Sequence, residues 1–255
     1  MQPANQSKAM VIAKPRRLWR IAFILAFALP ATAAEPPADL ARRVAAAETR
    51  NRDERLHFTY RQTVKVDEIE KRGGHFLEVR DVVFSPEGER SEVLIGSPMY
   101  ALTRLRMTEE DFRDIRDVQP FLFTSDQLWA YDVKYKGEET MDGAERWVID
   151  VRPKQILDTQ RLFEGLMWVS QDDFGVVRSE GKAVPDILGG KTENLFPHFT
   201  TLREKVDGKH WFPVLTVADD TLFFSNGGLH MKMRIEYAKY QRFGVESKIQ
   251  FETQK

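Results

Sequence analysis

The chain has 255 residues, of which 30% are charged and 42% are hydrophobic, and it contains no cysteine. This composition is typical of a globular protein with one large or two small domains, and it argues against a disordered chain. The lack of cysteine excludes a disulfide framework, a thiol nucleophile and a lipid-modified cysteine, so the core alone must stabilise the fold.

The N-terminal segment has three parts. Lys14, Arg16, Arg17 and Arg20 precede an apolar run over residues 21–29, and small residues follow up to Ala34. This order predicts a secretory signal peptide over residues 1–34, a single mature domain over 35–255 and a periplasmic location. A membrane anchor is the alternative, but the apolar run is shorter than the ~20 residues needed to span a bilayer.

Cleavage of this segment changes the charge of the protein. Residues 1–34 carry five positive charges and no negative one, so their removal changes the formal net charge from −1 to −6. A mildly acidic exported protein is a poor candidate for binding nucleic acid or an anionic lipid surface. We therefore expect no nucleic-acid partner, no stable membrane span after cleavage, and contact only with the acyl part of a lipid.

The mature chain begins with a helical pattern and then changes to an alternating one. Residues 40–55 are rich in alanine with apolar positions at helical spacing, which predicts a helix capped near Asp39. From Leu56 to Val66 apolar and polar residues alternate, which is typical of a strand with one dry face. Residues 77–83 and 91–95, separated by a turn over 85–88, predict a second antiparallel pair.

A short amphipathic helix is expected within residues 107–122. Thr108 is a suitable cap, acidic residues fill the first turn, and Phe112, Ile115 and Val118 share one side before Pro120. This segment interrupts the strand pattern, so we expect it to cover the sheet as a lid that includes Phe112 and Ile115.

Strands resume after this helix and continue to the end of the chain. They are expected in WAYDVKY, in RWVIDVRP, in the hairpin over 161–184, on both sides of Asp207-Gly208, over 229–237 and in a closing strand over 247–253. The fold class is therefore mainly β with short helices, an antiparallel meander of ten or eleven strands curled into a barrel or deep half-barrel.

The dry face of so wide a sheet must be buried against the sheet itself, against helices or against a guest molecule. The residues expected to line a cavity for acyl chain are long, apolar and adaptable: Phe58, Tyr60, Trp129, Tyr131, Trp147, Ile149, Leu166, Trp168, Met231 and Met233. A packed core without a cavity gives the same alternation, and it is the more frequent cause. The hypothesis of a bound acyl chain is kept because a ~16-carbon chain gains on the order of 12 kcal/mol on leaving water.

This layout resembles the LolA/LolB-like superfamily of exported lipoprotein carriers and the related sensor domains. The resemblance is carried by the leading helix, the strands from Leu56, the helix around Phe112, the pair WAYDVKY and RWVIDVRP, and FEGLMWVSQDDFGVVRSEG. It implies an incompletely closed β-barrel of about eleven strands with a helical plug and an apolar cavity, without enzyme activity or cofactor. Carriers of this superfamily use an arginine on an early strand to hold the lid closed. Arg61 and Arg80 lie on early strands here, but neither stands in a matching motif, so no such role is assigned to them.

Motifs for catalysis are missing from the sequence. The five histidines show no metal-ligand spacing, and neither a nucleophile elbow nor a phosphate-binding loop is present, so we expect no catalytic residue, no metal and no cofactor.

The leading hypothesis is a non-catalytic periplasmic carrier for lipid acyl chains or lipoproteins, of the outer-membrane lipoprotein-sorting type, with envelope transport proteins as further partners. The alternatives are an envelope sensor or scaffold that docks a protein partner through the same β-shell, and a hydrolase using scattered His and Asp.

Overall fold

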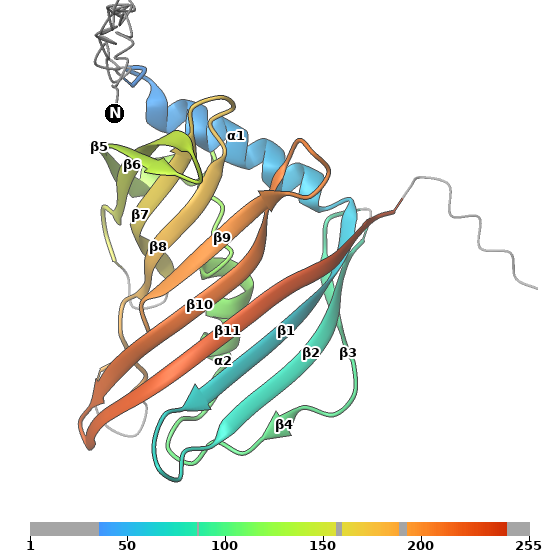
Figure 1. Ribbon diagram of the computed structural model, residues 1–255, viewed down its shortest axis with the longest axis vertical. Coiled ribbons are helices and arrows are strands. Elements are labelled where there is room, and N and C mark those ends of the chain that lie inside the picture. The colour runs from blue at the N-terminus through green and yellow to red at the C-terminus, as the bar shows by residue number, and fades with distance from the viewer. Residues whose placement is uncertain (1–35, 86, 157–159, 189–192, 244–255) are drawn as a thin grey trace, which may run out of the picture. The chain divides into compact units, whose positions relative to one another are not determined.

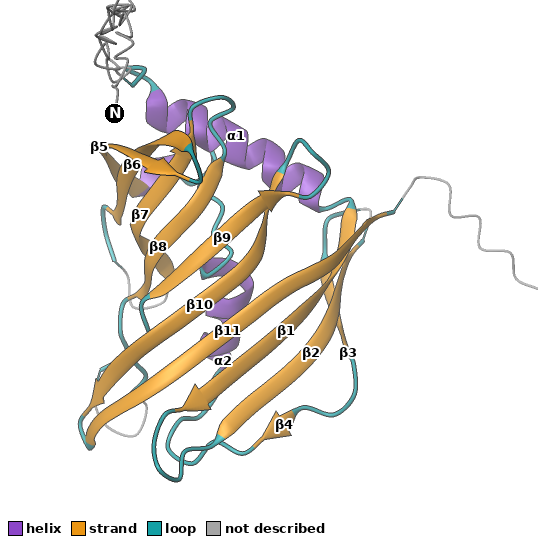
Figure 2. Ribbon diagram, in the orientation of Figure 1, coloured by secondary structure: helices purple, strands orange, loops and turns teal. Residues whose placement is uncertain are grey.

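The computed structural model describes residues 36–85, 87–156, 160–188 and 193–243. They form one antiparallel sheet of eleven strands with two main helical pieces, as Figures 1 and 2 show. The strand order is β3-β2-β1-β11-β10-β9-β8-β7-β6-β5, and β4 pairs with β2. Within the described residues β3 and β5 are free edges, so the sheet is an open half-barrel and the predicted fold class is confirmed.

The elements follow the predicted order along the chain. The helical elements are α1 (Leu40–Arg55), α2 (Glu109–Arg113), the π-turn η1 (Asp114–Val118) and the 3-10 turn η2 (Leu128–Ala130). The strands are β1 (Phe58–Glu68), β2 (His75–Phe84), β3 (Arg90–Leu94), β4 (Met99–Tyr100), β5 (Tyr131–Met141), β6 (Ala144–Pro153), β7 (Leu162–Ser170), β8 (Val176–Val184), β9 (Phe199–Lys205), β10 (Trp211–Phe224) and β11 (Gly227–Arg242). The closing strand expected over 247–253 and the signal peptide both fall outside the described residues.

Alternation along the strands produces one continuous inner face. The strand register aligns a row across seven neighbouring strands: Val64, Ile235, Thr216, Thr201, Ser179, Met167 and Ile149. All seven side chains are buried, and the middle three are hydroxyls. Thr201 donates to the backbone carbonyl of Gln119 at 2.7 Å, so the polar centre of the row binds the segment that covers it.

That covering segment, residues 102–127, is called the lid here. It connects β4 to η2, contains no strand, and passes over the inner face with α2 and η1 near its middle (Figure 1). Thr108 caps α2 in a reciprocal capping box with Asp111, as the sequence predicts. The helix then loosens into the π-turn, and four lid side chains belong to the main hydrophobic core: Ile115, Val118, Phe121 and Phe123.

Helix α1 crosses one end of the sheet and is fixed there by a buried ion pair. The predicted helix is confirmed, but Asp39 makes no capping hydrogen bond and accepts one from Arg43 instead. At the middle of the helix, Glu48 binds Arg203 of β9 at 2.5 Å, and both side chains are fully buried. Arg203 also donates to the backbone carbonyl of Phe121, so one guanidinium joins helix, sheet and lid.

Removing one partner of this buried pair should destabilise the fold strongly. We expect Glu48→Gln to lower the free energy of unfolding by about 3–5 kcal/mol, because it leaves the Arg203 charge buried without a counter-ion. Urea unfolding followed by circular dichroism measures this change.

The matched control is Asp126→Ala, which removes the exposed pair between Asp126 and Arg52 of the same helix. It should cost under about 1 kcal/mol. Equal effects of the two substitutions would contradict a special role for the buried pair.

Candidate functional site

Seven of the residues expected to line a cavity lie on the inner face. Met231 and Met233 border a small cavity under the lid together with Ile115. The other five are buried in the packed core of that face or beside it: Phe58, Tyr60, Tyr131, Trp147 and Ile149. The interior is therefore filled by protein side chains to a greater extent than the sequence suggests.

Leu166 and Trp168 face the opposite side of the sheet, so their assignment to the cavity wall is corrected. Trp168 packs with Val148 and Val177 in a second cluster, and its indole donates to Glu139 at 2.8 Å. The inner face of β7 is instead formed by Phe163, Gly165, Met167 and Val169, which pair across the sheet with inward residues. Both faces of this strand are apolar, so alternation alone cannot distinguish them, and the hydrogen bond to Glu139 favours the outer side for the indole.

Trp129 is also corrected. It lies in the turn η2 before β5 begins and is 75% exposed. The run WAYDVKY therefore contributes to the inner face only from Tyr131 onward, because the turn breaks the alternation that places Trp129 beside Tyr131.

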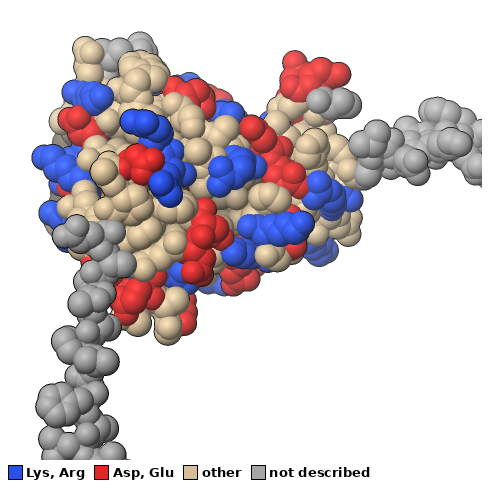
Figure 3. All heavy atoms as spheres, turned by 90° about the horizontal axis from the view of Figure 1, so that it is seen from above, with Lys and Arg blue, Asp and Glu red and all other residues tan. Residues whose placement is uncertain are grey.

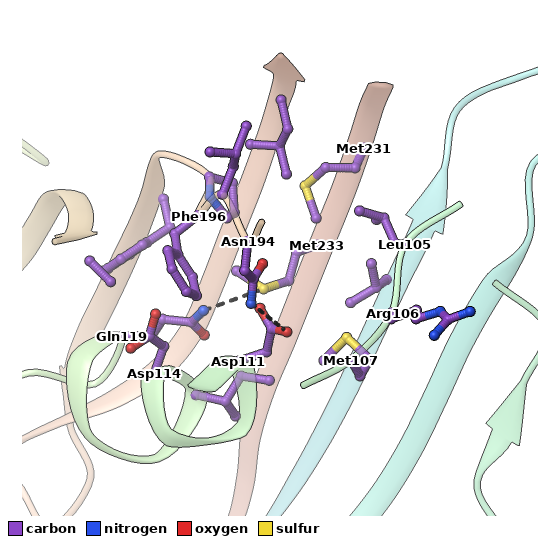
Figure 4. Close-up of a pocket in the computed structure, with 17 residues that line it drawn as sticks. Leu105, Arg106, Met107, Asp111, Asp114, Gln119, Asn194, Phe196, Met231 and Met233 are labelled. Atoms are coloured by element: carbon purple, nitrogen blue, oxygen red, sulfur yellow. Dashed lines mark hydrogen bonds between the residues drawn. The ribbon is translucent and has the colours of Figure 1, made fainter. Parts of the chain in front are cut away.

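The cavity under the lid has a volume of about 50 Å³ and lies between the lid, the segment 194–197 and strands β1, β8, β9, β10 and β11. Figure 4 shows Met231 and Met233 reaching into it from β11. Its apolar walls are completed by Val66, Leu105, Met107, Ala183, Leu195, Phe196, Phe199 and Leu222. An engineered cavity of about 150 Å³ holds one benzene molecule, so the cavity in this state has room for a small group and not for an acyl chain.

One wall of the cavity is polar. Asp111 and Asp114 come from α2 and η1, Gln119 follows the π-turn, and Asn194 lies on the facing segment. Asn194 donates to Asp111 at 3.2 Å and to Thr108 at 2.9 Å, which holds the lid against the segment after β8. Gln119 is 5% exposed, its Nε2 contacts the Met233 sulfur at 3.5 Å, and its Oε1 has no hydrogen-bond partner among the described residues.

A buried ion pair fixes the lid beside this wall. Arg161 donates from Nε to Asp114 Oδ1 at 3.1 Å and from Nη2 to Oδ2 at 2.7 Å. Its Nη1 donates to the carbonyl of Pro185, and its face lies 3.6 Å from the centre of the Phe196 ring. Burial raises the pKa of Asp114 to about 6, even though the Arg161 guanidinium acts in the opposite direction.

The start of the lid is anchored by a second carboxylate. Glu68, at the end of β1, accepts hydrogen bonds from the backbone amides of Gly74, Thr103, Arg104 and Leu105. Burial acts to raise the pKa of Glu68, but these bonds and that from the Thr103 hydroxyl outweigh it and lower the pKa to about 2. Phe112 adds an aromatic contact with Phe76 of β2, and the Arg80 guanidinium lies over the Phe112 ring, 5.6 Å from its centre.

A cluster of potential metal ligands lies away from this cavity. Glu54, Asp207 and His210 offer ligand atoms within 4.8 Å of one another, and the sequence gives no spacing that would reveal them. Each group already has a protein partner: Arg242 pairs with Glu54, and Asp207 accepts from His210 and from backbone amides of the β9–β10 turn. These contacts account for the cluster as a structural link between α1 and that turn.

Charge is distributed evenly on the surface seen from above. In Figure 3 the Lys and Arg side chains on that face are interspersed with Asp and Glu. Such mixing favours many weak ion pairs and gives no single-sign patch on this face for a polyanion.

Comparison with known proteins finds similarity of structure only. No family model matches the sequence, and no curated protein matches it. The chain is similar to a DUF1329 family protein from Desulfovibrio piger, with 15% identity, 81% of this chain and 98% of that chain covered, and a TM-score of 0.35. It is also similar to a LolA superfamily protein from Nitrosomonas europaea, with 12% identity, 82% of this chain and 99% of that chain covered, and a TM-score of 0.35. A third similar structure is a domain described as an outer membrane lipoprotein-sorting protein, from Vibrio parahaemolyticus. Its identity is 9%, 79% of this chain and 93% of that chain are covered, and the TM-score is 0.35.

These similarities agree with the LolA-like layout expected from the sequence. At this level of identity and TM-score they say nothing about ligand or role, so the function has to be argued from the chain's own residues. None of the described helices is both long enough and apolar enough to cross a bilayer.

The raised pKa of Asp114 predicts a pH-dependent stability. Between pH 4 and 6 the folded state keeps a proton on Asp114 that the unfolded chain has lost, so this residue makes the free energy of unfolding fall as pH rises. We expect the stability of the natural protein, measured relative to Asp114→Asn, to decrease by roughly 2 kcal/mol from pH 4 to 6.5.

Urea unfolding of both proteins at intervals of half a pH unit measures the difference. Groups such as Glu68 titrate identically in the two proteins and cancel. A relative stability that increases with pH would mean that Arg161 dominates and that the pKa of Asp114 lies below its ordinary value.

Proposed function

We propose that this protein is an exported, non-catalytic carrier or binding protein that holds the acyl chain of a lipid or lipoprotein between its lid and the inner face of its sheet. The observation that carries the proposal is the apolar cavity under the lid, walled by Met231, Met233 and Phe196. Methionine packs irregular shapes and is favoured where a surface must adapt to different guests.

The cavity of about 50 Å³ requires the lid to move before a chain can enter. A ~16-carbon chain gains on the order of 12 kcal/mol on leaving water. Exposing the four lid side chains of the main hydrophobic core costs about 1.5–3 kcal/mol each, or roughly 6–12 kcal/mol together. The two quantities are similar in size, so a guest chain is able to compensate for the apolar contacts that the lid gives up.

The construction of the lid suits such an exchange. Its residues pair with no strand, so lifting it breaks no ladder of the sheet. It is fixed by separate polar contacts, namely those of Glu68, Asp114 and the carbonyls of Gln119 and Phe121. The π-turn η1 is a short irregular element of the kind that often marks functional positions in helices.

The remaining parts of the proposal follow from the sequence. The segment over residues 1–34 favours export to the periplasm, where a protein that shields acyl chains from water has an obvious use. Envelope proteins that deliver or receive the lipid would then be its partners, and the absence of catalytic motifs favours transport over hydrolysis.

Filling the cavity should weaken chain binding without unfolding the protein. Ala183 borders the cavity, so Ala183→Leu adds an isopropyl group to a space of about 50 Å³. We expect the natural protein to bind a fluorescent fatty acid and Ala183→Leu to bind it at least about tenfold more weakly, because the inserted group fills space that the chain needs.

The matched control is Ala238→Leu, the same change on the exposed face of β11. Thermal unfolding checks that both variants remain folded. Native mass spectrometry of protein purified from its own host adds an independent reading, since a carrier should retain lipid. Protein without bound lipid that also takes up no fluorescent fatty acid would contradict the proposal.

A second function, docking of a protein partner, is favoured by the free edge at β3. Val93, Leu94 and Ile95 are exposed there, whereas the opposite edge strand β5 carries Lys134 and Lys136 and a bulge beside Gly137. Lysines and bulges are common devices that keep edge strands from pairing with other chains. β3 has neither, and its two charged side chains, Arg90 and Glu92, are paired with each other. A crosslinked complex formed through β3, in protein that takes up no chain, would favour an envelope sensor over a carrier.

A further inference from the structure

The polar wall of the cavity offers acceptors and almost no free donors. Asp111 Oδ2 is bound by Thr108 and Asn194, whereas no hydrogen bond reaches its Oδ1 within the described part of the chain. The Asn194 amide nitrogen is engaged with Thr108 and Asp111, which leaves its carbonyl oxygen as the available atom. In Figure 4 these side chains converge on the same side of the cavity.

Gln119 is a further acceptor in this wall and is independent of the two acids. It is 95% buried, it borders the cavity, and its Oε1 is a buried oxygen for which the described residues provide no donor. An unpaired buried carbonyl oxygen is costly, so a group that donates a hydrogen bond to it is stabilised at this position.

The cations nearby are not available to a ligand. Arg161 uses Nε and Nη2 on Asp114 and Nη1 on Pro185, while Phe196 covers one face of its guanidinium. Arg106 borders the cavity, but Figure 4 shows its guanidinium pointing away from the other labelled side chains. A carboxylate or phosphate head would therefore meet Asp111, Asp114 and two carbonyl oxygens without a free cation to bind.

We infer that the ligand of this cavity is a single-chain or acyl-chain amphiphile whose polar head donates hydrogen bonds, a hydroxyl or an amine, and that anionic heads are rejected. The inference rests on the proposed function and names the ligand class of the same site. The head occupies the small polar end beside Gln119 and Asp111, and the chain takes the place of lid side chains along the inner face. Burial raises the pKa of Asp111, and a bound ammonium would relieve the cost of keeping its carboxylate ionised.

The test compares four twelve-carbon ligands that differ only in the head: dodecylamine, dodecanol, laurate and dodecyl phosphate. Each competes with the neutral fluorescent probe N-phenyl-1-naphthylamine for the full-length folded protein, below its micelle concentration, at pH 7.5 and physiological salt. We expect the amine and the alcohol to displace the probe at concentrations at least about tenfold lower than laurate or dodecyl phosphate.

Two variants locate this selectivity in the wall. Gln119→Leu should weaken dodecanol but leave the affinity for the neutral probe within a factor of about two, since only the head loses its acceptor. Asp111→Asn should reduce the preference for the amine over the alcohol, because the charge is lost and the shape is kept. Asp117→Asn, an exposed acid on the same π-turn, is the control for general attraction to an acidic protein and should change neither preference.

The outcomes separate the inference from the proposed function. Laurate binding as tightly as dodecanol, or Asp117→Asn changing the preferences as much as Asp111→Asn, overturns the donor-head inference and leaves the carrier proposal standing. Failure of the neutral probe and of all four ligands to bind overturns both.

Discussion

The inner face of the sheet must be kept from water, and most of the structure follows from the way in which the chain does this. Eleven strands with one apolar side leave more surface than a single crossing helix covers, and the sheet remains open at β3 and β5. The lid covers the remaining face with Ile115, Val118, Phe121 and Phe123, which pack as a guest would. Burial of apolar area supplies the free energy that holds a cover on the sheet. Because the hydrophobic effect has no direction, it does not determine which segment forms that cover.

Polar contacts provide the direction that burial lacks. Glu68 holds the beginning of the lid, Asp114 holds the π-turn to Arg161, and Arg203 holds the end near Phe121 while also binding Glu48. Buried ion pairs contribute little net stability once desolvation is counted, but each is costly to break on one side only. The lid is therefore placed at three points by interactions that are specific in geometry, while the contacts between them are apolar and exchangeable.

The sequence predicts the elements well because alternation, turn residues and caps are local signals. Helix α1, the Thr108 cap and the hairpin at Asp207-Gly208 all depend on neighbours within a few residues. Local signals do not predict which residues of β7 face inward, since the strand is apolar on both sides. The outward position of Trp168 is accompanied by a hydrogen bond to Glu139, which belongs to another strand. The Asp114–Arg161 pair and the unpaired Gln119 join segments far apart in sequence, so no local pattern reveals them.

The near balance between lid and guest has a consequence for affinity. A chain that binds only when the lid is raised has an apparent dissociation constant equal to the intrinsic one divided by the fraction of open protein. Each kcal/mol that favours the closed lid therefore weakens loading, and each 1.4 kcal/mol weakens it about tenfold. Under the proposed carrier function this arrangement favours release of the cargo, because lid side chains that return would compete directly for the same face. If the exchange of lid for guest is nearly neutral in its apolar part, as proposed, a few hydrogen bonds at the polar wall are sufficient to decide which amphiphile is held.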